Sequence, residues 1–91
     1  MSNNYKYLLV EDLKKDSFWL KILSQRSKKY IGIKNATKSK IIYISKNSQG
    51  YIINKLDIAG KKINILPYTS REVGRMMGWD YCISVISHEG L

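Results

Sequence analysis

The predicted fold depends on residues 26–66, which run RSKKYIGIKNATKSKIIYISKNSQGYIINKLDIAGKKINIL. Runs of Ile and Tyr bounded by polar turn residues are typical of strands, because these side chains fit a pleated, half-buried surface. Four such runs predict strands near residues 30–34, 40–45, 51–58 and 61–66. We expect them to form an antiparallel, meander-like sheet.

The connections between these runs support this prediction. Residues 35–39 and 47–50 are rich in Asn, Ser and Gly, which favour loops. Residues 57–60 suit a tight hairpin in which Gly60 takes a positive φ, and Pro67 closes the last strand because it cannot donate a ladder hydrogen bond. The predicted core comprises Ile31, Ile33, Ile42, Ile44, Ile52, Leu56, Ile63 or Leu66, Val73 and Met77.

The two ends of the chain carry further apolar runs and one helix signal. Residues 5–10 and 18–23 are short apolar runs that fit strands or an amphipathic helix, and we favour strand, turn and strand. Thr69 stands three residues before Glu72, the spacing of a capping box, which predicts a short helix near 69–78. The β-branched run 81–87 predicts a last strand. The fold class is therefore one α+β domain, residues 1–91.

Residues 68–79 resemble the first helix and turn of a helix-turn-helix DNA-binding unit. In that unit a small residue, here Gly74, lies four positions before the turn glycine, here Gly78. Residues 80–91 depart from the pattern, because they contain no Lys or Arg and their β-branched content disfavours a recognition helix. We therefore favour a single helix packed on the sheet over a complete unit.

The composition is that of a small globular protein. The chain has 91 residues, of which 44% are hydrophobic, and its single cysteine, Cys82, cannot form an internal disulfide. No apolar run approaches the roughly 20 residues that cross a bilayer. Residues 1–5 lack the basic end and apolar stretch of a signal peptide, so we expect a cytoplasmic protein without membrane contact.

The positive charge is concentrated in the middle of the chain. The net charge is +9, and residues 13–62 hold thirteen Lys or Arg against only Asp16 and Asp57. Between Arg26 and Lys46 there are seven basic residues and no Asp or Glu. This distribution favours a polyanionic partner. The alternative is a solvating surface with the Lys, Ile, Asn and Tyr bias of an AT-rich genome.

A basic face that also carries tyrosines suits single-stranded nucleic acid, because lysines neutralise phosphates and unpaired bases stack on rings. We therefore predict a nucleic-acid-binding protein, for DNA or RNA, with little sequence specificity. The alternative for the tyrosines is cross-strand packing. The predicted binding residues are Arg26, Lys28, Lys29, Tyr30, Lys34, Lys38, Lys40, Tyr43, Lys46, Tyr51 and Lys55.

The sequence predicts neither catalysis nor a bound cofactor. Cys82 and His88 are the only residues of their kinds, which is too few for a four-ligand metal site and a weak basis for a nucleophile with its base. The alternative function is a small interaction protein, of the phage or mobile-element type, that binds a larger nucleic-acid-processing machine. A homodimer is expected if the sheet leaves an edge uncovered.

Overall fold

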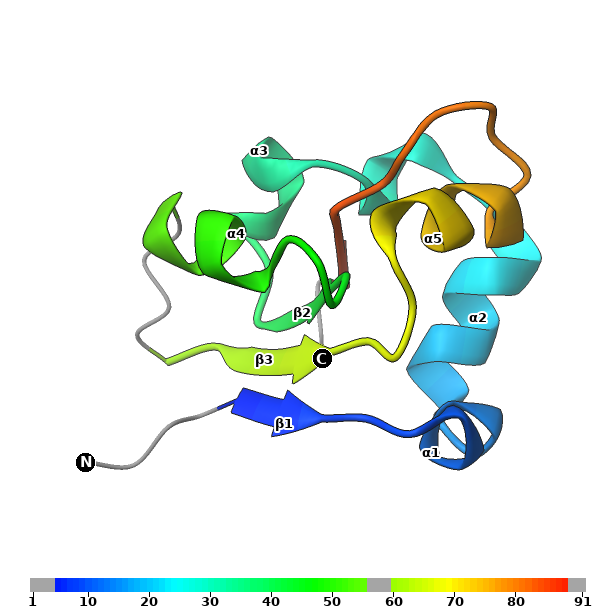
Figure 1. The fold of residues 1–91 in the computed structure, drawn as a ribbon, viewed down its shortest axis with the longest axis horizontal. Helices are drawn as coiled ribbons and strands as arrows, with labels where there is room; N and C mark the ends of the chain where they lie inside the picture. Colours follow the sequence, from blue (N-terminus) through cyan, green and yellow to red (C-terminus); the bar gives the residue numbers. More distant parts are fainter. Residues whose placement is uncertain (1–4, 56–59, 89–91) are drawn as a thin grey trace.

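A four-stranded sheet forms the centre of the molecule in the computed structural model, which describes residues 5–55 and 60–88 (Figure 1). The strands are β1 (Tyr5–Tyr7), β2 (Ile41–Ile44), β3 (Lys62–Ile65) and β4 (Val85–His88), in the spatial order β1-β3-β2-β4. β3 pairs with β1 and β2 in parallel, and β4 pairs with β2 in antiparallel. The strands expected near 40–45 and 61–66 are confirmed, but the antiparallel meander is wrong because the sheet is mixed.

The expected strand at 51–58 is wrong over residues 51–55, which belong to helix α4 (Gln49–Lys55). Parallel strands need a crossover connection, and α4 lies in the connection from β2 to β3. The helix buries Ile52 fully and Ile53 partly against the sheet. The rest of that strand and most of the expected hairpin at 57–60 lie outside the described residues, although Gly60 does have a positive φ of 74°.

The expected strand at 30–34 is also wrong. A 3₁₀ turn, η1 (Lys28–Tyr30), is followed by the short helix α3 (Ile33–Ala36), and only a single bridge joins Ile31 to Ile86 of β4. Gly32 separates the two turns with φ of 100°, a value that side chains with a Cβ rarely adopt. The segment therefore lies along the outer edge of β4 without extending the sheet.

The N-terminal region is mostly helical, so strand, turn and strand is correct only for β1. Helices α1 (Val10–Lys14) and α2 (Ser17–Gln25) occupy the rest. Asp16 begins α2, because its Oδ1 accepts hydrogen bonds from the N–H groups of Phe18 at 3.0 Å and Trp19 at 3.1 Å. This capping explains why residues 18–23 form a helix despite their strand-like composition.

The expected helix near 69–78 is confirmed as α5 (Ser70–Met76). The Thr69 side chain accepts from the Glu72 N–H at 3.3 Å, and the Glu72 carboxylate accepts from the Thr69 N–H at 3.0 Å. Gly74 lies so close to the Tyr81 carbonyl that a Cβ there would overlap with it. The chain then continues into β4, so the described residues contain no recognition helix after the turn at Gly78.

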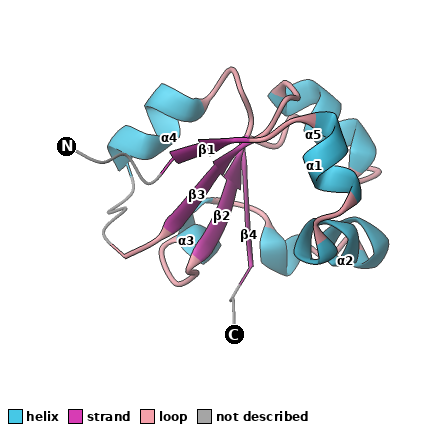
Figure 2. Cartoon of the chain, turned by 90° about the horizontal axis from the view of Figure 1, so that it is seen from below, coloured by secondary structure: helices cyan, strands magenta, loops and turns pink. Residues whose placement is uncertain are grey.

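Helices cover both faces of the sheet (Figure 2). α1, α2 and α5 lie on one side, where Trp19, Ile22, Tyr43 and Val73 belong to one apolar cluster. α3 and α4 lie on the other, over a cluster that includes Ile42, Ile44, Ile52, Ile63 and Val85. Of the predicted core, Ile42, Ile44, Ile52, Ile63, Leu66, Val73 and Met77 are buried, Ile31 and Ile33 are only partly buried, and Leu56 lies outside the described residues.

The described helices include none that is long and apolar enough to cross a membrane. The edges of the sheet are β1 and β4. The homodimer expected from an uncovered edge stays a prediction.

Candidate functional site

The cations of the central stretch all lie at the surface. The seven basic residues from Arg26 to Lys46 are exposed, and so is Lys55. They point in several directions, because the Lys28 Nζ lies 5.1 Å above the Trp79 ring, whereas the Lys29 Nζ lies 5.2 Å from the Tyr30 ring. The structure therefore distributes the predicted charge over more than one patch.

The predicted tyrosines are not arranged as an open face on the sheet. Tyr30 and Tyr43 are 5% and 1% exposed, because helices cover both faces of the sheet, so neither ring is open to stacking. Tyr51 is 60% exposed on α4, where the Lys55 Nζ lies 4.8 Å above its ring. The expectation of an aromatic sheet surface is wrong in its geometry, and Tyr51 alone of these three rings is accessible.

Tyr43 has a structural partner. Its hydroxyl donates to Asp16 Oδ2 at 2.8 Å, while the other oxygen of this carboxylate caps α2. Burial raises the pKa of Tyr43 far above its ordinary value, and the bond to the Asp16 carboxylate acts in the same direction. Tyr43 therefore anchors α2 to the centre of the sheet.

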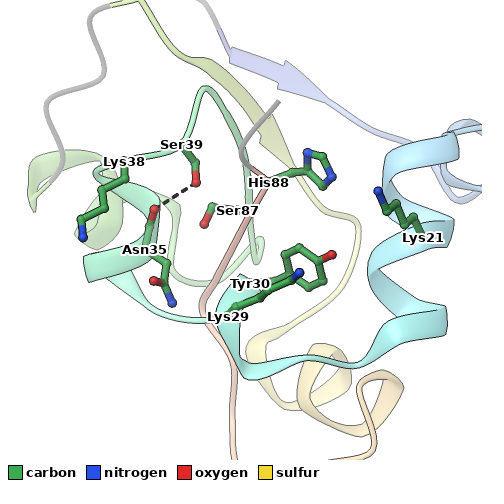
Figure 3. Close-up of a pocket in the computed structure, with 8 residues that line it drawn as sticks. All are labelled: Lys21, Lys29, Tyr30, Asn35, Lys38, Ser39, Ser87 and His88. Atoms are coloured by element: carbon green, nitrogen blue, oxygen red, sulfur yellow. Dashed lines mark hydrogen bonds between the residues drawn. The ribbon is translucent and has the colours of Figure 1, made fainter. Parts of the chain in front are cut away.

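A pocket of about 210 Å³ lies at the end of β4, beside η1, α2 and the C-terminal end of α3 (Figure 3). In this view Ser87 lies on one side of the His88 and Tyr30 rings, Lys21 on α2 lies on the other side, and Lys38 lies at the rim. Among the described residues that line the pocket three are lysines and none is acidic. The lining residues are Lys21, Lys29, Tyr30, Asn35, Lys38, Ser39, Ser87 and His88.

Aromatic contacts build one wall of this pocket. His88 is 7% exposed and stacks on Tyr30 with 5.9 Å between ring centroids and 12° between planes. The Phe18 ring lies 4.6 Å from the His88 ring on a tilted plane. Tyr30 also donates a hydrogen bond from its hydroxyl to Gln25 Oε1. These contacts fix the side of the pocket that faces α2.

The opposite wall is the turn after α3. Ser39 Oγ donates to the Asn35 carbonyl at 2.9 Å (Figure 3). The Lys61 ammonium donates to the carbonyls of Ala36, Thr37 and Ser39 at 3.2, 2.9 and 2.7 Å. A cation therefore occupies the carbonyl-rich end of α3, where the helix dipole favours positive charge.

The pocket joins three predicted residues to five that sequence reasoning did not include. Lys29, Tyr30 and Lys38 are predicted binding residues, and the others come from α2, α3, the turn after α3, and β4. The one local signal for Ser87 is a polar residue inside the β-branched run 81–87. The predicted residues outside this pocket are Arg26, Lys28, Lys34, Lys40, Tyr43, Lys46, Tyr51 and Lys55.

Cys82 and His88, which could form a nucleophile and its base only if they were in contact, line different hollows. Cys82 is exposed and lines a second hollow with Arg71, Arg75 and Trp79, whereas His88 lines the pocket at β4. Within the described ranges, no group of three His, Cys, Asp or Glu side chains could hold a metal ion.

No family model matches the chain, and no curated protein matches it in sequence.

Proposed function

We propose that this protein binds nucleic acid without catalysing a reaction, prefers a single strand to a duplex, and reads little base sequence. The observation that carries this proposal is the exposure of all seven cations between Arg26 and Lys46, in a stretch without Asp or Glu. No carboxylate of the stretch itself competes for these cations. Outside the stretch, the Glu72 carboxylate interacts with Lys46. We expect the other six cations to contact phosphates.

The predominance of lysine supports weak base specificity. Lysine is a flexible point charge that follows phosphates, whereas base readout more often uses the planar fork of arginine. Six of the seven cations are lysines. Affinity should therefore arise mainly from counterion release. Neutralising about 5 phosphates of a single strand predicts a log–log salt slope of about −3.5.

The preference for a single strand rests on Tyr51. Its exposed ring, with the Lys55 ammonium beside it, can stack on an unpaired base, an interaction worth roughly 1–3 kcal/mol. The bases of a duplex are stacked on one another and offer no free face. Tyr51→Ala should therefore weaken binding to a single strand and leave binding to a duplex nearly unchanged.

The test is a fluorescence-polarisation titration of single- and double-stranded DNA and RNA at two salt concentrations. Replacing Lys28, Lys29 and Lys34 with Ala should weaken binding to every sequence and flatten the slope to about −1.4, because three contacts are lost. The control replaces the exposed lysines Lys6, Lys14 and Lys15, which changes the net charge equally. If both triple variants bind alike, the central stretch is not the interface.

A protein partner is the second candidate function. Tyr7, at the end of β1, is 64% exposed, and Leu9 and Val10, at the start of α1, are 65% and 43% exposed. Neighbouring exposed apolar side chains favour protein contact. This function would replace the first if no oligonucleotide binds at about 0.1 M salt, where screening leaves close contacts intact. Leu9→Ser would then weaken the partner complex without changing the fold.

A further inference from the structure

The Ser87 hydroxyl is the least expected group in the pocket at the end of β4. Ser87 is 2% exposed, and among the described residues its Oγ has no hydrogen-bond partner. Most buried polar side chains are hydrogen-bonded, because an unpaired polar group loses its bonds to water and gains nothing in return. A hydroxyl that is buried, unpaired and within a pocket is therefore a group that a ligand can satisfy.

The main chain of Ser87 also faces away from the sheet. The Ser45 N–H donates to the Ser84 carbonyl at 3.0 Å, and the register of β2 and β4 places Ile42 opposite Ser87. Groups along an antiparallel strand point alternately toward the partner and away from it. The Ser87 N–H therefore points to the outer edge of β4, where the Gly32 N–H bonds to the Val85 carbonyl at 3.2 Å and the bridge between Ile31 and Ile86 pairs residues 30–32 with this edge. The bridge uses the main chain of Ser87, so the hydroxyl is the group that is left for a ligand.

The charge around this serine favours an anion. Lys21, Lys29 and Lys38 line the pocket, and none of its described lining residues is acidic. The carbonyls at the end of α3 would repel an anion. The Lys61 ammonium donates hydrogen bonds to three of these carbonyls, including that of Ser39 in the pocket wall. Lys61 thus neutralises the repulsive end of a helix and adds positive charge behind the wall.

The size of the pocket limits the anion to a small group. Its volume of about 210 Å³ is below the roughly 300–1,000 Å³ of pockets that enclose whole drug-sized ligands. A phosphate fits such a space better than a complete nucleotide does. The Tyr30 ring is already stacked on His88, so the pocket does not offer that ring to a base.

We propose that this pocket binds a phosphate monoester, the terminal phosphate of a nucleic-acid strand, through the Ser87 hydroxyl with the ammonium groups of Lys21 and Lys29. A monoester carries up to two negative charges and three terminal oxygens, which suits several cations and donors. An internal phosphodiester carries one charge and has chain on both sides, so it cannot reach a hydroxyl that is almost fully buried. This inference rests on the proposed binding of single strands and adds recognition of their ends.

The experiment compares one oligonucleotide in three forms, with a 5′-phosphate, with a 3′-phosphate, or with hydroxyls at both ends. Affinity is measured by fluorescence polarisation at fixed salt, with the label at the end opposite the phosphate. We expect one phosphorylated form to bind about tenfold tighter than the hydroxyl form, the effect of one hydrogen bond to a charged group. Inorganic phosphate and a nucleoside monophosphate are added as competitors.

Two serine variants provide a matched pair. Ser87→Ala should abolish the preference for the phosphorylated end, whereas Ser45→Ala should keep it. Ser45 is 0% exposed and its Oγ is also unpaired among the described residues, but it does not line the pocket. Both variants exchange a hydroxyl for hydrogen inside the protein, and thermal melts check that both remain folded. Lys21→Ala should reduce the preference, and Lys14→Ala, on α1, should not.

The outcomes separate this inference from the proposed function. Equal binding of all three oligonucleotides overturns end recognition and leaves single-strand binding in place. The absence of binding by any oligonucleotide overturns both. If inorganic phosphate alone binds, and binding is lost in Ser87→Ala, the pocket takes free phosphate and the assignment to a strand end is wrong.

Discussion

The bond between Asp16 and Tyr43 predicts a strong energetic coupling between helix α2 and the sheet. One carboxylate serves two purposes, because Oδ1 caps α2 and Oδ2 accepts from the buried Tyr43 hydroxyl at 2.8 Å. Asp16→Ala removes the cap, at a cost of about 1 kcal/mol, and leaves a buried hydroxyl unpaired, at a further cost of about 2 kcal/mol. We expect the free energy of unfolding to fall by about 3 kcal/mol.

The melting temperature should show this loss clearly. In a domain of this size each kcal/mol lowers Tm by roughly 4–8 °C, so Asp16→Ala should lower it by about 12 °C or more. Asp16→Ser should lower it less, because serine caps a helix about as well as aspartate but its single hydroxyl cannot cap the helix and also reach Tyr43. Tyr43→Phe should cost about 1.5 kcal/mol, because it removes a hydrogen bond to a charged group and leaves the cap in place.

A double-mutant cycle measured by urea denaturation is the decisive assay. In a Tyr43→Phe background no hydroxyl is left unpaired, so Asp16→Ala should cost only about 1 kcal/mol for the cap. The coupling between the two positions is then about 2 kcal/mol. If the two changes are additive within about 0.5 kcal/mol, the bond does not contribute as the geometry indicates.

Three further predictions follow from the same structure. The pKa of Tyr43 is raised above its ordinary value of 10.0, so the unfolded chain loses this proton first as pH rises. The free energy of unfolding should therefore be full below about pH 10 and fall by about 1.4 kcal/mol per pH unit above it. Tyr43→Phe should remove this slope in urea titrations. Gly74→Ala places a Cβ against the Tyr81 carbonyl and should destabilise the protein by about 2 kcal/mol in thermal melts. The matched variant Gly50→Ala meets open space within a helix and should stabilise by roughly 0.5–1 kcal/mol. Equal Tm values of the two variants would contradict the close approach of Gly74 to this carbonyl. Thr69→Ala removes the side chain that accepts from the Glu72 N–H and should cost about 1 kcal/mol, seen as lower Tm and lower helical circular dichroism; an unchanged melt would show that the cap is unimportant.

Local patterns predicted the elements whose signal lies within a few residues. The Ile and Tyr run at 41–44 became β2, and the pair Thr69 and Glu72 marked the start of α5 because each satisfies a main-chain group of the other. The run at 81–87 is confirmed as a strand only over residues 85–87, which begin β4 (Val85–His88), and residues 81–84 are not in a strand. β-branched side chains suit this strand because it is buried on both faces. In these segments the local preference and the fold agree.

The failures have a common physical origin in tertiary structure. Ile52 and Ile53 favour a strand by propensity, yet they lie in α4 because the parallel pairing of β2 and β3 needs a crossover, and their burial against the sheet outweighs the small cost of β-branched residues in a helix. A short apolar run does not indicate whether the strand beside it in the sheet runs parallel or antiparallel to it. Composition therefore predicts the strands at 41–44 and 62–65 but not their pairing, and the antiparallel meander does not follow from it.

The candidate site was predictable in its charge and not in its geometry. The lysines are visible as a run without acids, and their exposure follows from their cost of burial. The pocket arises only when the end of β4 comes to lie beside η1 and α2, so Ser87 and Lys21 become neighbours of Lys29 through pairing over long sequence distances. The tyrosines were misjudged for the same reason, since the helices that cover them are remote in sequence.

The strand order also bears on the kinetics of folding. β2 and β3 are central, and among the described residues α4 is the element that connects them, whereas β1 pairs with β3, and β4 with β2, across much longer chain segments. Closing a longer loop costs more entropy, so we expect the nucleus to form from β2, α4 and β3, with the two edges added later. The pocket at the end of β4 then forms only after β4 has paired with β2. Phosphate bound there should slow unfolding and leave the refolding rate nearly unchanged.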